Sequence, residues 1–112
     1  MTEITDKGDY AFGTLVDAAT ISWNVKGARV ARVTLAAPRT LGTPQGVIAG
    51  QHYMLQITQG GVGNNTLTVP SNFLFSGGGS LELSTGVGVV DLLSLWYDGE
   101  NFYCTVLNNY QP

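Results

Sequence analysis

His52 and Cys104 are the single histidine and the single cysteine of the chain, so they are the first candidates for nucleophilic chemistry. A Cys–His dyad needs both side chains in contact in a cleft, with a third group that orients the imidazole. No local motif supplies this arrangement, and Cys104 lies in an apolar segment between Tyr103 and Thr105. We therefore expect Cys104 to be a small core residue and His52 to lie at an edge or on the surface.

The carboxylates of the chain do not follow the spacing of a calcium loop, and no Cys/His cluster is present for zinc. Glycoside hydrolysis requires two carboxylates in one groove, and Glu82 with Asp91 is the pair that the sequence leaves open. Asp98 and Glu100 flank Gly99, and turn chemistry explains Asp98 without a function. No G-x-S-x-G motif marks a serine nucleophile. The sequence predicts no catalytic, metal-binding or cofactor-binding residue, and hence a protein that is not an enzyme.

Two glycine-rich segments, 60–63 and 86–88, have some similarity to phosphate-binding loops. Neither completes G-x-G-x-x-G, because Thr66 and Asp91 stand where the last glycine is required. Neither leads into a predicted helix, whose N-terminal N–H groups would hold the phosphate. We interpret both segments as turns.

Aromatic side chains gather around the turn at Asp98-Gly99, where they could stack on sugar rings. Packing in a core or in a subunit interface is the commoner fate of such residues. The polar residues that would contact a partner or a glycan are Asp98, Asn101, Asn64 and Asn65.

Low charge limits the classes of partner that the chain can bind. Five Lys and Arg residues stand against eight Asp and Glu, the formal net charge is −3, and charged residues make up 12% of the chain. Scattered cations provide no phosphate-tracking surface, so we expect no nucleic-acid binding. The start of the chain has no apolar signal segment and no tract predicts a membrane span, so we expect synthesis in a cytoplasm and no membrane insertion.

Short apolar runs alternate with Gly, Pro, Asn and Asp every eight to twelve residues, which is typical of a sandwich or barrel of short strands. Several runs show the period of two that marks a half-buried sheet. The expected strands are residues 19–25, 29–37, 52–59, 66–69, 73–75, 80–84, 89–97 and 102–108. Almost no helix is expected. Residues 1–10 are polar and are interpreted as an N-terminal arm, followed by one domain over residues 11–112.

Asp98-Gly99 is the strongest hairpin signal, because a type I′ turn needs positive φ at both central residues. The strand that precedes it, 89–97, is apolar on both faces. Such a strand lies either between two layers or in a subunit interface, and the small size of the domain favours an interface. The expected interface residues are Leu93, Leu95, Trp96 and Tyr97.

The C-terminal half carries its short segments in a distinctive order. They read GQHYMLQITQ from Gly50, NTLTV from Asn65, FLFSGG from Phe73, LELST from Leu81, VDLLSL from Val90 and YDGENFYC from Tyr97. Together with the upstream segments 33–36 and 39–41, this series resembles a module of tailed-bacteriophage virion proteins, found in capsid decoration proteins, head fibres and tail-fibre tips. The resemblance implies an antiparallel β-sandwich of jelly-roll type, assembled as a homotrimer, without catalytic residues or cofactor.

Two functions remain open from the sequence. The first is a trimeric capsid decoration (cement) protein that binds the phage major capsid protein on the outer surface of the virion. The alternative is the tip domain of a head or tail fibre that binds a host surface glycan. A hydrolase that uses Glu82 and Asp91 is a third and weaker reading.

Overall fold

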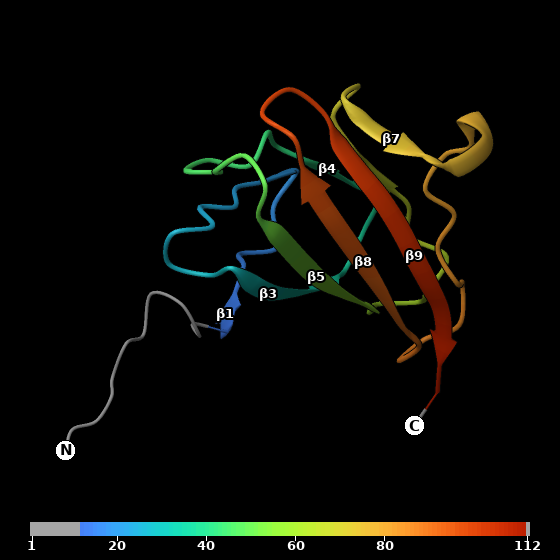
Figure 1. The fold of residues 1–112 in the computed structure, drawn as a ribbon. Coiled ribbons are helices and arrows are strands. Elements are labelled where there is room, and N and C mark those ends of the chain that lie inside the picture. Colours follow the sequence, from blue (N-terminus) through green and yellow to red (C-terminus); the bar gives the residue numbers. More distant parts are fainter. Residues whose placement is uncertain (1–11, 112) are drawn as a thin grey trace, which may run out of the picture.

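The computed structural model describes residues 12–111, so the predicted arm at 1–10 lies outside the described part of the chain. The described residues form nine strands and one 3₁₀ turn (Figure 1). The elements are β1 (Phe12–Thr14), β2 (Thr20–Ile21), β3 (Val30–Leu35), β4 (Arg39–Leu41), β5 (His52–Gln59), β6 (Leu67–Thr68), β7 (Phe73–Phe75), η1 (Ser76–Gly78), β8 (Val90–Tyr97) and β9 (Phe102–Tyr110). The all-β prediction is confirmed.

The strands form two sheets. The larger is mixed, with the order β1-β3-β5-β8-β9-β7, and the smaller has the order β2-β4-β6. β5 with β8 and β8 with β9 are antiparallel, as in the pair Leu55 and Leu93. The other five strand pairs between residues 12 and 111 are parallel. The expectation of an antiparallel sandwich is therefore wrong in strand direction.

The winding of the chain explains the parallel pairs. From β1 to β7, successive strands alternate between the larger and the smaller sheet. Successive strands of one sheet run in the same direction, because the chain crosses to the other sheet and back between them. Residues 12–68 thus wind like a short solenoid, whereas a jelly roll consists of antiparallel strands. The predicted jelly-roll connectivity is therefore not confirmed.

Alternate side chains of the strands fill the space between the two sheets. Burial along β3 and β5 has a period of two, as a sheet with one dry face requires. The larger sheet contributes Ala31, Val33, Leu35, Leu55, Ile57, Leu93 and Leu95, and the smaller sheet contributes Ile21, Leu41 and Leu67. Trp23 is buried with them, and its indole N–H donates to the Ala28 carbonyl at 2.6 Å. The core therefore belongs to both layers.

Some strand boundaries differ from the predicted ones. β5 and β7 occupy the expected residues 52–59 and 73–75, whereas β1 and β4 were not expected. Residues 80–84 form no strand, although Leu81 and Leu83 pack against the core as their alternation indicates. A hydrogen bond from the Ser84 N–H to the Asp91 carboxylate holds this segment instead of a strand ladder.

Candidate interaction surfaces

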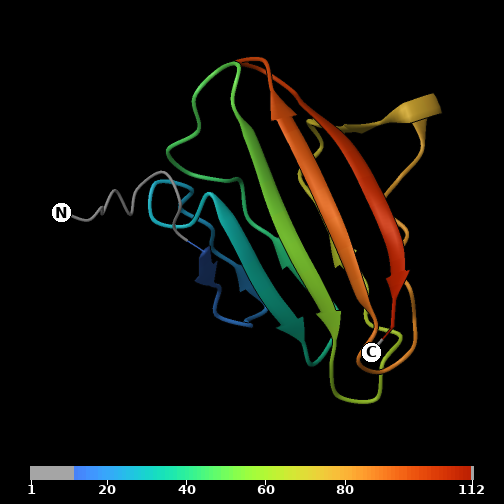
Figure 2. The same ribbon diagram turned by 60° about the horizontal axis from the view of Figure 1, so that its bottom comes forward.

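One face of the larger sheet has no layer over it in the described residues. The smaller sheet lies behind the other face, as the two views in Figure 1 and Figure 2 show. We call the uncovered side the outer face. The register places its side chains in four rows: His52, Trp96, Tyr103 and Leu74; Phe12, Val30, Met54, Ser94 and Thr105; Thr14, Arg32, Gln56, Leu92 and Leu107; and Thr34, Thr58, Val90 and Tyr110.

The outer face is apolar over β8 and β9 and almost free of charge. Trp96 is 39% exposed and its ring lies 5.8 Å from that of Tyr103, centroid to centroid. Leu107, two rows away, is 52% exposed. Arg32 is the one Lys or Arg among the rows above; its guanidinium lies 4.7 Å from the Phe12 ring centroid and its Nε donates to Thr14. The part of the face over β8 and β9 therefore offers a surface that can be buried without enclosing a charge.

The four expected interface residues do not share this face. Leu93 and Leu95 are completely buried between the two sheets, so they have no surface left for a second subunit, and their prediction is wrong. Tyr97 also lies on the inner side, half-buried, with its ring stacked on Phe102 at 4.5 Å. Trp96 is on the outer face. The strand is apolar on both sides because one side builds the core and the other builds this surface.

The hairpin tip is a four-residue loop rather than a two-residue type I′ turn. Gly99 has φ 103°, but Asp98 is not in the positive-φ region, and the Asp98 N–H donates to the Asn101 carbonyl. The Asp98 Oδ1 accepts the N–H groups of Asn101 at 2.7 Å and Glu100 at 2.8 Å, which lowers the pKa of Asp98. Its Oδ2 accepts the Tyr103 hydroxyl at 3.1 Å, which raises the pKa of Tyr103. The Asp98 carboxylate is thus used to hold the loop.

The four residues expected to contact a partner or glycan are not brought together. Asp98 and Asn101 lie beyond the β5 end that carries His52, whereas Asn64 and Asn65 follow the opposite end of β5 (Figure 2). Asn64 is exposed and has φ 59°.

Asn65 is buried and is a structural residue. Its side-chain amide donates to the carbonyls of Leu35 at 2.9 Å and Gly60 at 3.1 Å. The prediction of Asn65 as a glycan contact is therefore wrong, because its polar atoms are engaged inside the protein.

The groups that could have formed a catalytic site are separated. Asp91 is buried and accepts hydrogen bonds from the Ser84 N–H and hydroxyl and from the Asn109 N–H, at 2.7 to 2.9 Å. Glu82 is exposed and accepts the Ser80 hydroxyl at 3.2 Å. The Asp91 carboxylate closes the irregularity in the β8–β9 register, where Asn109 has φ 73°. Its hydrogen bonds account for it as a structural group.

His52 and Cys104 lie on opposite faces of the larger sheet, so they form no dyad. His52 is exposed in the row with Trp96, and Cys104 is buried, as expected. Burial raises the pKa of the Cys104 thiol to about 12, so the thiolate is scarce at neutral pH. Within residues 12–111, no three His, Cys, Asp or Glu side chains are grouped as metal ligands would be. No helix in this range is long and apolar enough to cross a membrane.

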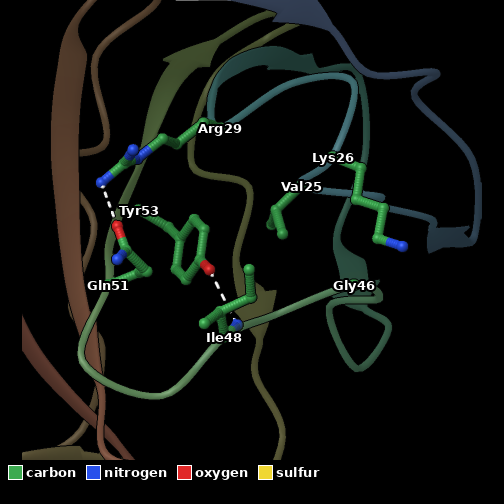
Figure 3. A pocket seen from close by; sticks show the side chains of 7 residues that line it. All are labelled: Val25, Lys26, Arg29, Gly46, Ile48, Gln51 and Tyr53. Carbon is green, nitrogen blue, oxygen red and sulfur yellow. Dashed lines mark hydrogen bonds between the residues drawn. The ribbon is translucent and has the colours of Figure 1, made fainter. Parts of the chain in front are cut away.

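A pocket that the sequence did not indicate opens between the turn at 24–29, the loop at 45–51 and the start of β5 (Figure 3). Its volume is about 360 Å³, and it is lined by Val25, Lys26, Arg29, Gly46, Ile48, Gln51 and Tyr53. Lys26 and Arg29 are close in the sequence, which is the one signal that could have marked them. We call this the Tyr53 pocket.

Comparison with known proteins adds no relative. No protein-family model, curated protein or solved structure matches the chain.

Proposed function

We propose that the protein is a non-enzymatic structural protein of a tailed-bacteriophage virion: a capsid decoration protein that self-associates as a trimer and binds the major capsid protein. The segments from Gly50 to Cys104 that resemble the phage module support the virion role and the trimeric state. The outer face is the observation that supports self-association, since it is a broad apolar surface with nothing over it in the described residues.

The chemistry of the outer face favours burial against a second copy. Monomeric soluble proteins rarely expose a contiguous apolar patch of more than a few hundred Å². Over β8 and β9 the face carries Val90, Leu92 and Trp96 beside Tyr103 and Leu107, with no ionised carboxylate or ammonium between them. Copies that meet over β8 and β9 then bury aromatic and aliphatic area without desolvating a charge. Joining three subunits also lets weak contacts with the shell add up to firm attachment.

A charge introduced on the outer face tests the self-association. We expect the wild-type chain to be trimeric at micromolar concentration in light scattering coupled to size exclusion. Leu107→Glu places a carboxylate on the face and should give monomers with an unchanged circular dichroism spectrum. Val62→Glu is the matched control, because Val62 is 93% exposed on the loop beyond β5 and away from the face. A monomeric wild type, or a Leu107→Glu chain that remains trimeric, contradicts the proposal.

Binding to shells tests the second half of the proposal. Wild-type protein and Val62→Glu should add to capsids assembled without the protein and co-sediment with them in proportion to shell area. Leu107→Glu should bind much more weakly, because its single sites no longer act together. A trimer that ignores such capsids would leave self-association in place and remove the decoration role.

The alternative, a glycan-binding tip of a head or tail fibre, has one observation in its favour. A pocket of about 580 Å³ is lined by Trp96 and Tyr103 together with residues of the segment 74–76. Paired aromatic rings of this kind can stack on a sugar. The same two rings cannot be both buried between subunits and open to a glycan. The variant Trp96→Ala therefore separates the two functions. It should weaken trimer formation if the protein is a capsid decoration protein, and it should weaken binding on a glycan array if the protein is a fibre tip.

A further inference from the structure

We propose that the Tyr53 pocket binds a neutral N-acetylhexosamine residue, whose acetamido carbonyl accepts the Tyr53 hydroxyl and whose methyl group packs on Val25 and Ile48. This site goes beyond the decoration role and does not depend on it, because the pocket is formed within a single chain and uses no outer-face row.

A buried hydrogen-bond donor without a partner lies in this pocket. Tyr53 is 5% exposed, and its hydroxyl oxygen accepts the Ile48 N–H at 2.9 Å. A phenol both accepts and donates, and no group in residues 12–111 accepts the Tyr53 proton. A buried donor that stays unpaired is costly, so the hydroxyl favours a ligand that brings an acceptor atom into the pocket.

The groups beside this hydroxyl are apolar. Figure 3 shows the side chains of Val25 and Ile48 directed toward the same space as the Tyr53 hydroxyl. An acceptor that reaches the hydroxyl therefore needs an apolar group next to it, so that these walls are not left against water or against a second polar group. A carbonyl bonded directly to a methyl group has this form, and in a sugar it is the acetamido group.

The charged side chains of the pocket do not converge on this space. Figure 3 shows the Lys26 ammonium directed away from it, with the Arg29 guanidinium on the opposite side. Arg29 is engaged there, because its Nη2 donates to the Gln51 Oε1 at 2.7 Å and its Nε donates to the His52 carbonyl at 3.1 Å. A carboxylate between the apolar walls would lose its hydration without gaining a cation as partner. The pocket therefore favours a neutral acceptor.

The size and the rim of the pocket favour a sugar ring over an isolated amide. Ligand pockets span about 300–1,000 Å³, and a volume of about 360 Å³ lies within that range. An acetamido group alone would leave most of this space unfilled. Gln51 lines the pocket, and the hydrogen bond from Arg29 to its Oε1 fixes the orientation of its amide. The Gln51 amide nitrogen has no acceptor among the described residues, so it can donate to a ring hydroxyl.

Titration of the full chain, followed by the NMR signals of its methyl groups, tests the proposal. We expect N-acetylglucosamine or N-acetylgalactosamine to shift the signals of Val25 and Ile48 saturably, with an affinity that does not change as NaCl is raised. Three probes should each bind at least about tenfold more weakly: glucose, which lacks the acetamido group, N-methylacetamide, which lacks the ring, and sodium acetate, which is charged. Equal affinity for any of them overturns the proposal. Glucose would remove the role of the acetamido group, N-methylacetamide would indicate a site for a peptide, and acetate would indicate a site for an anion.

Matched variants show whether this pocket is the site. Tyr53→Phe removes one hydroxyl and should weaken binding about three- to tenfold, whereas Tyr110→Phe removes a hydroxyl from the outer face and should leave binding unchanged. Ile48→Ser removes an apolar wall at an exposed position and should also weaken binding, with Val62→Ser as its control on the loop beyond the other end of β5. Thermal melting checks that each variant is folded. Unchanged affinity in folded Tyr53→Phe and Ile48→Ser chains, or no saturable shift in the wild type, overturns the proposal, whatever the oligomeric state of the protein.

Discussion

Gln59, at the end of β5, holds two loops through one buried amide. Its side chain is 3% exposed. The Nε2 group donates to the carbonyls of Asn65 at 2.7 Å and Ser84 at 2.9 Å, and the Oε1 accepts the Asn65 N–H at 2.9 Å. The change Gln59→Leu keeps the approximate volume and removes all three hydrogen bonds. We expect this change to be strongly destabilising.

The magnitude follows from the groups that lose their partner. The N–H and C=O of Asn65 stay buried, whereas the carbonyl of the half-exposed Ser84 can be reached by water. Each buried unsatisfied group costs about 1–3 kcal/mol, so the two groups of Asn65 predict a loss of about 2–6 kcal/mol. Domains of this kind have unfolding free energies of about 5–15 kcal/mol, so the loss is a large part of the total.

Urea unfolding at one low protein concentration measures the effect, because self-association would otherwise shift the midpoint. Gln56→Leu is the control: Gln56 lies on the same strand, half-exposed on the outer face, and its free energy of unfolding should change by less than about 0.5 kcal/mol. If the two variants unfold at the same urea concentration with equal slopes, the buried amide does not hold the loops and the reasoning is refuted.

If Gln59→Leu fails to fold, Gln59→Glu provides the measurement. The protonated acid can still donate one hydrogen bond, whereas the carboxylate faces the carbonyls of Asn65 and Ser84. Burial then raises the folded pKa of this glutamate above its unfolded value of about 4.3. Its stability relative to wild type should be greatest below that value and should fall as pH rises through the folded pKa. A difference that does not vary with pH would contradict the placement.

Three further predictions concern other groups. Asp91→Ala removes three hydrogen bonds from the β8–β9 irregularity and should cost about 3 kcal/mol in unfolding free energy, whereas Glu82→Gln, at an exposed position, should change it little. Cys104, whose pKa is raised to about 12 by burial, should react with a thiol reagent at pH 8 only after denaturation, and rapid labelling of folded protein would contradict its position. The hydrogen bonds from Arg39 lower the pKa of Asp17 below its ordinary value of 3.8. The stability that this pair contributes is therefore present above pH 3.8 and is lost as pH falls through the folded pKa. In Asp17→Asn, the free energy of unfolding should vary less with pH over this acid range.

Strands with strong alternation could be predicted from the sequence, because alternation reflects which side chains are buried. β5 is the clearest example: Tyr53, Leu55 and Ile57 face the core and the predicted boundaries agree with the structure. Short strands such as β4 could not, because three residues after Pro38 carry no periodicity and depend on their neighbours for pairing. Strand direction was also beyond reach, since the same alternation suits parallel and antiparallel partners.

The interaction residues were predicted less well for a related reason. β8 is apolar on both faces, but the sequence does not say which of the two faces meets the core of its own chain. Leu93 and Leu95 face the core of their own chain, whereas Trp96 lies on the outer face, where its place in a subunit interface stays a prediction. The sequence indicates only that Asn65 is a polar loop residue, whereas its side-chain amide donates hydrogen bonds to the carbonyls of Leu35 and Gly60. The Tyr53 pocket is formed by segments that are separate in the sequence and meet only in the fold, so almost no local sequence pattern indicates it.

The solenoid-like winding of residues 12–68 also sets the order in which the chain can fold. A parallel pair such as β3 with β5 forms only after the intervening chain has crossed to the other sheet and returned. The entropic cost of closing this large loop is therefore incurred before the contacts between the two strands can offset it. The β8–β9 hairpin closes over four residues and is the one local pairing of the larger sheet. We expect this hairpin to nucleate folding, β5 to join it next, and the parallel strands to follow slowly, so that refolding takes milliseconds to seconds, as in other proteins of high contact order. A chain that emerges N-terminus first therefore holds its earliest strands unpaired until its last residues are made.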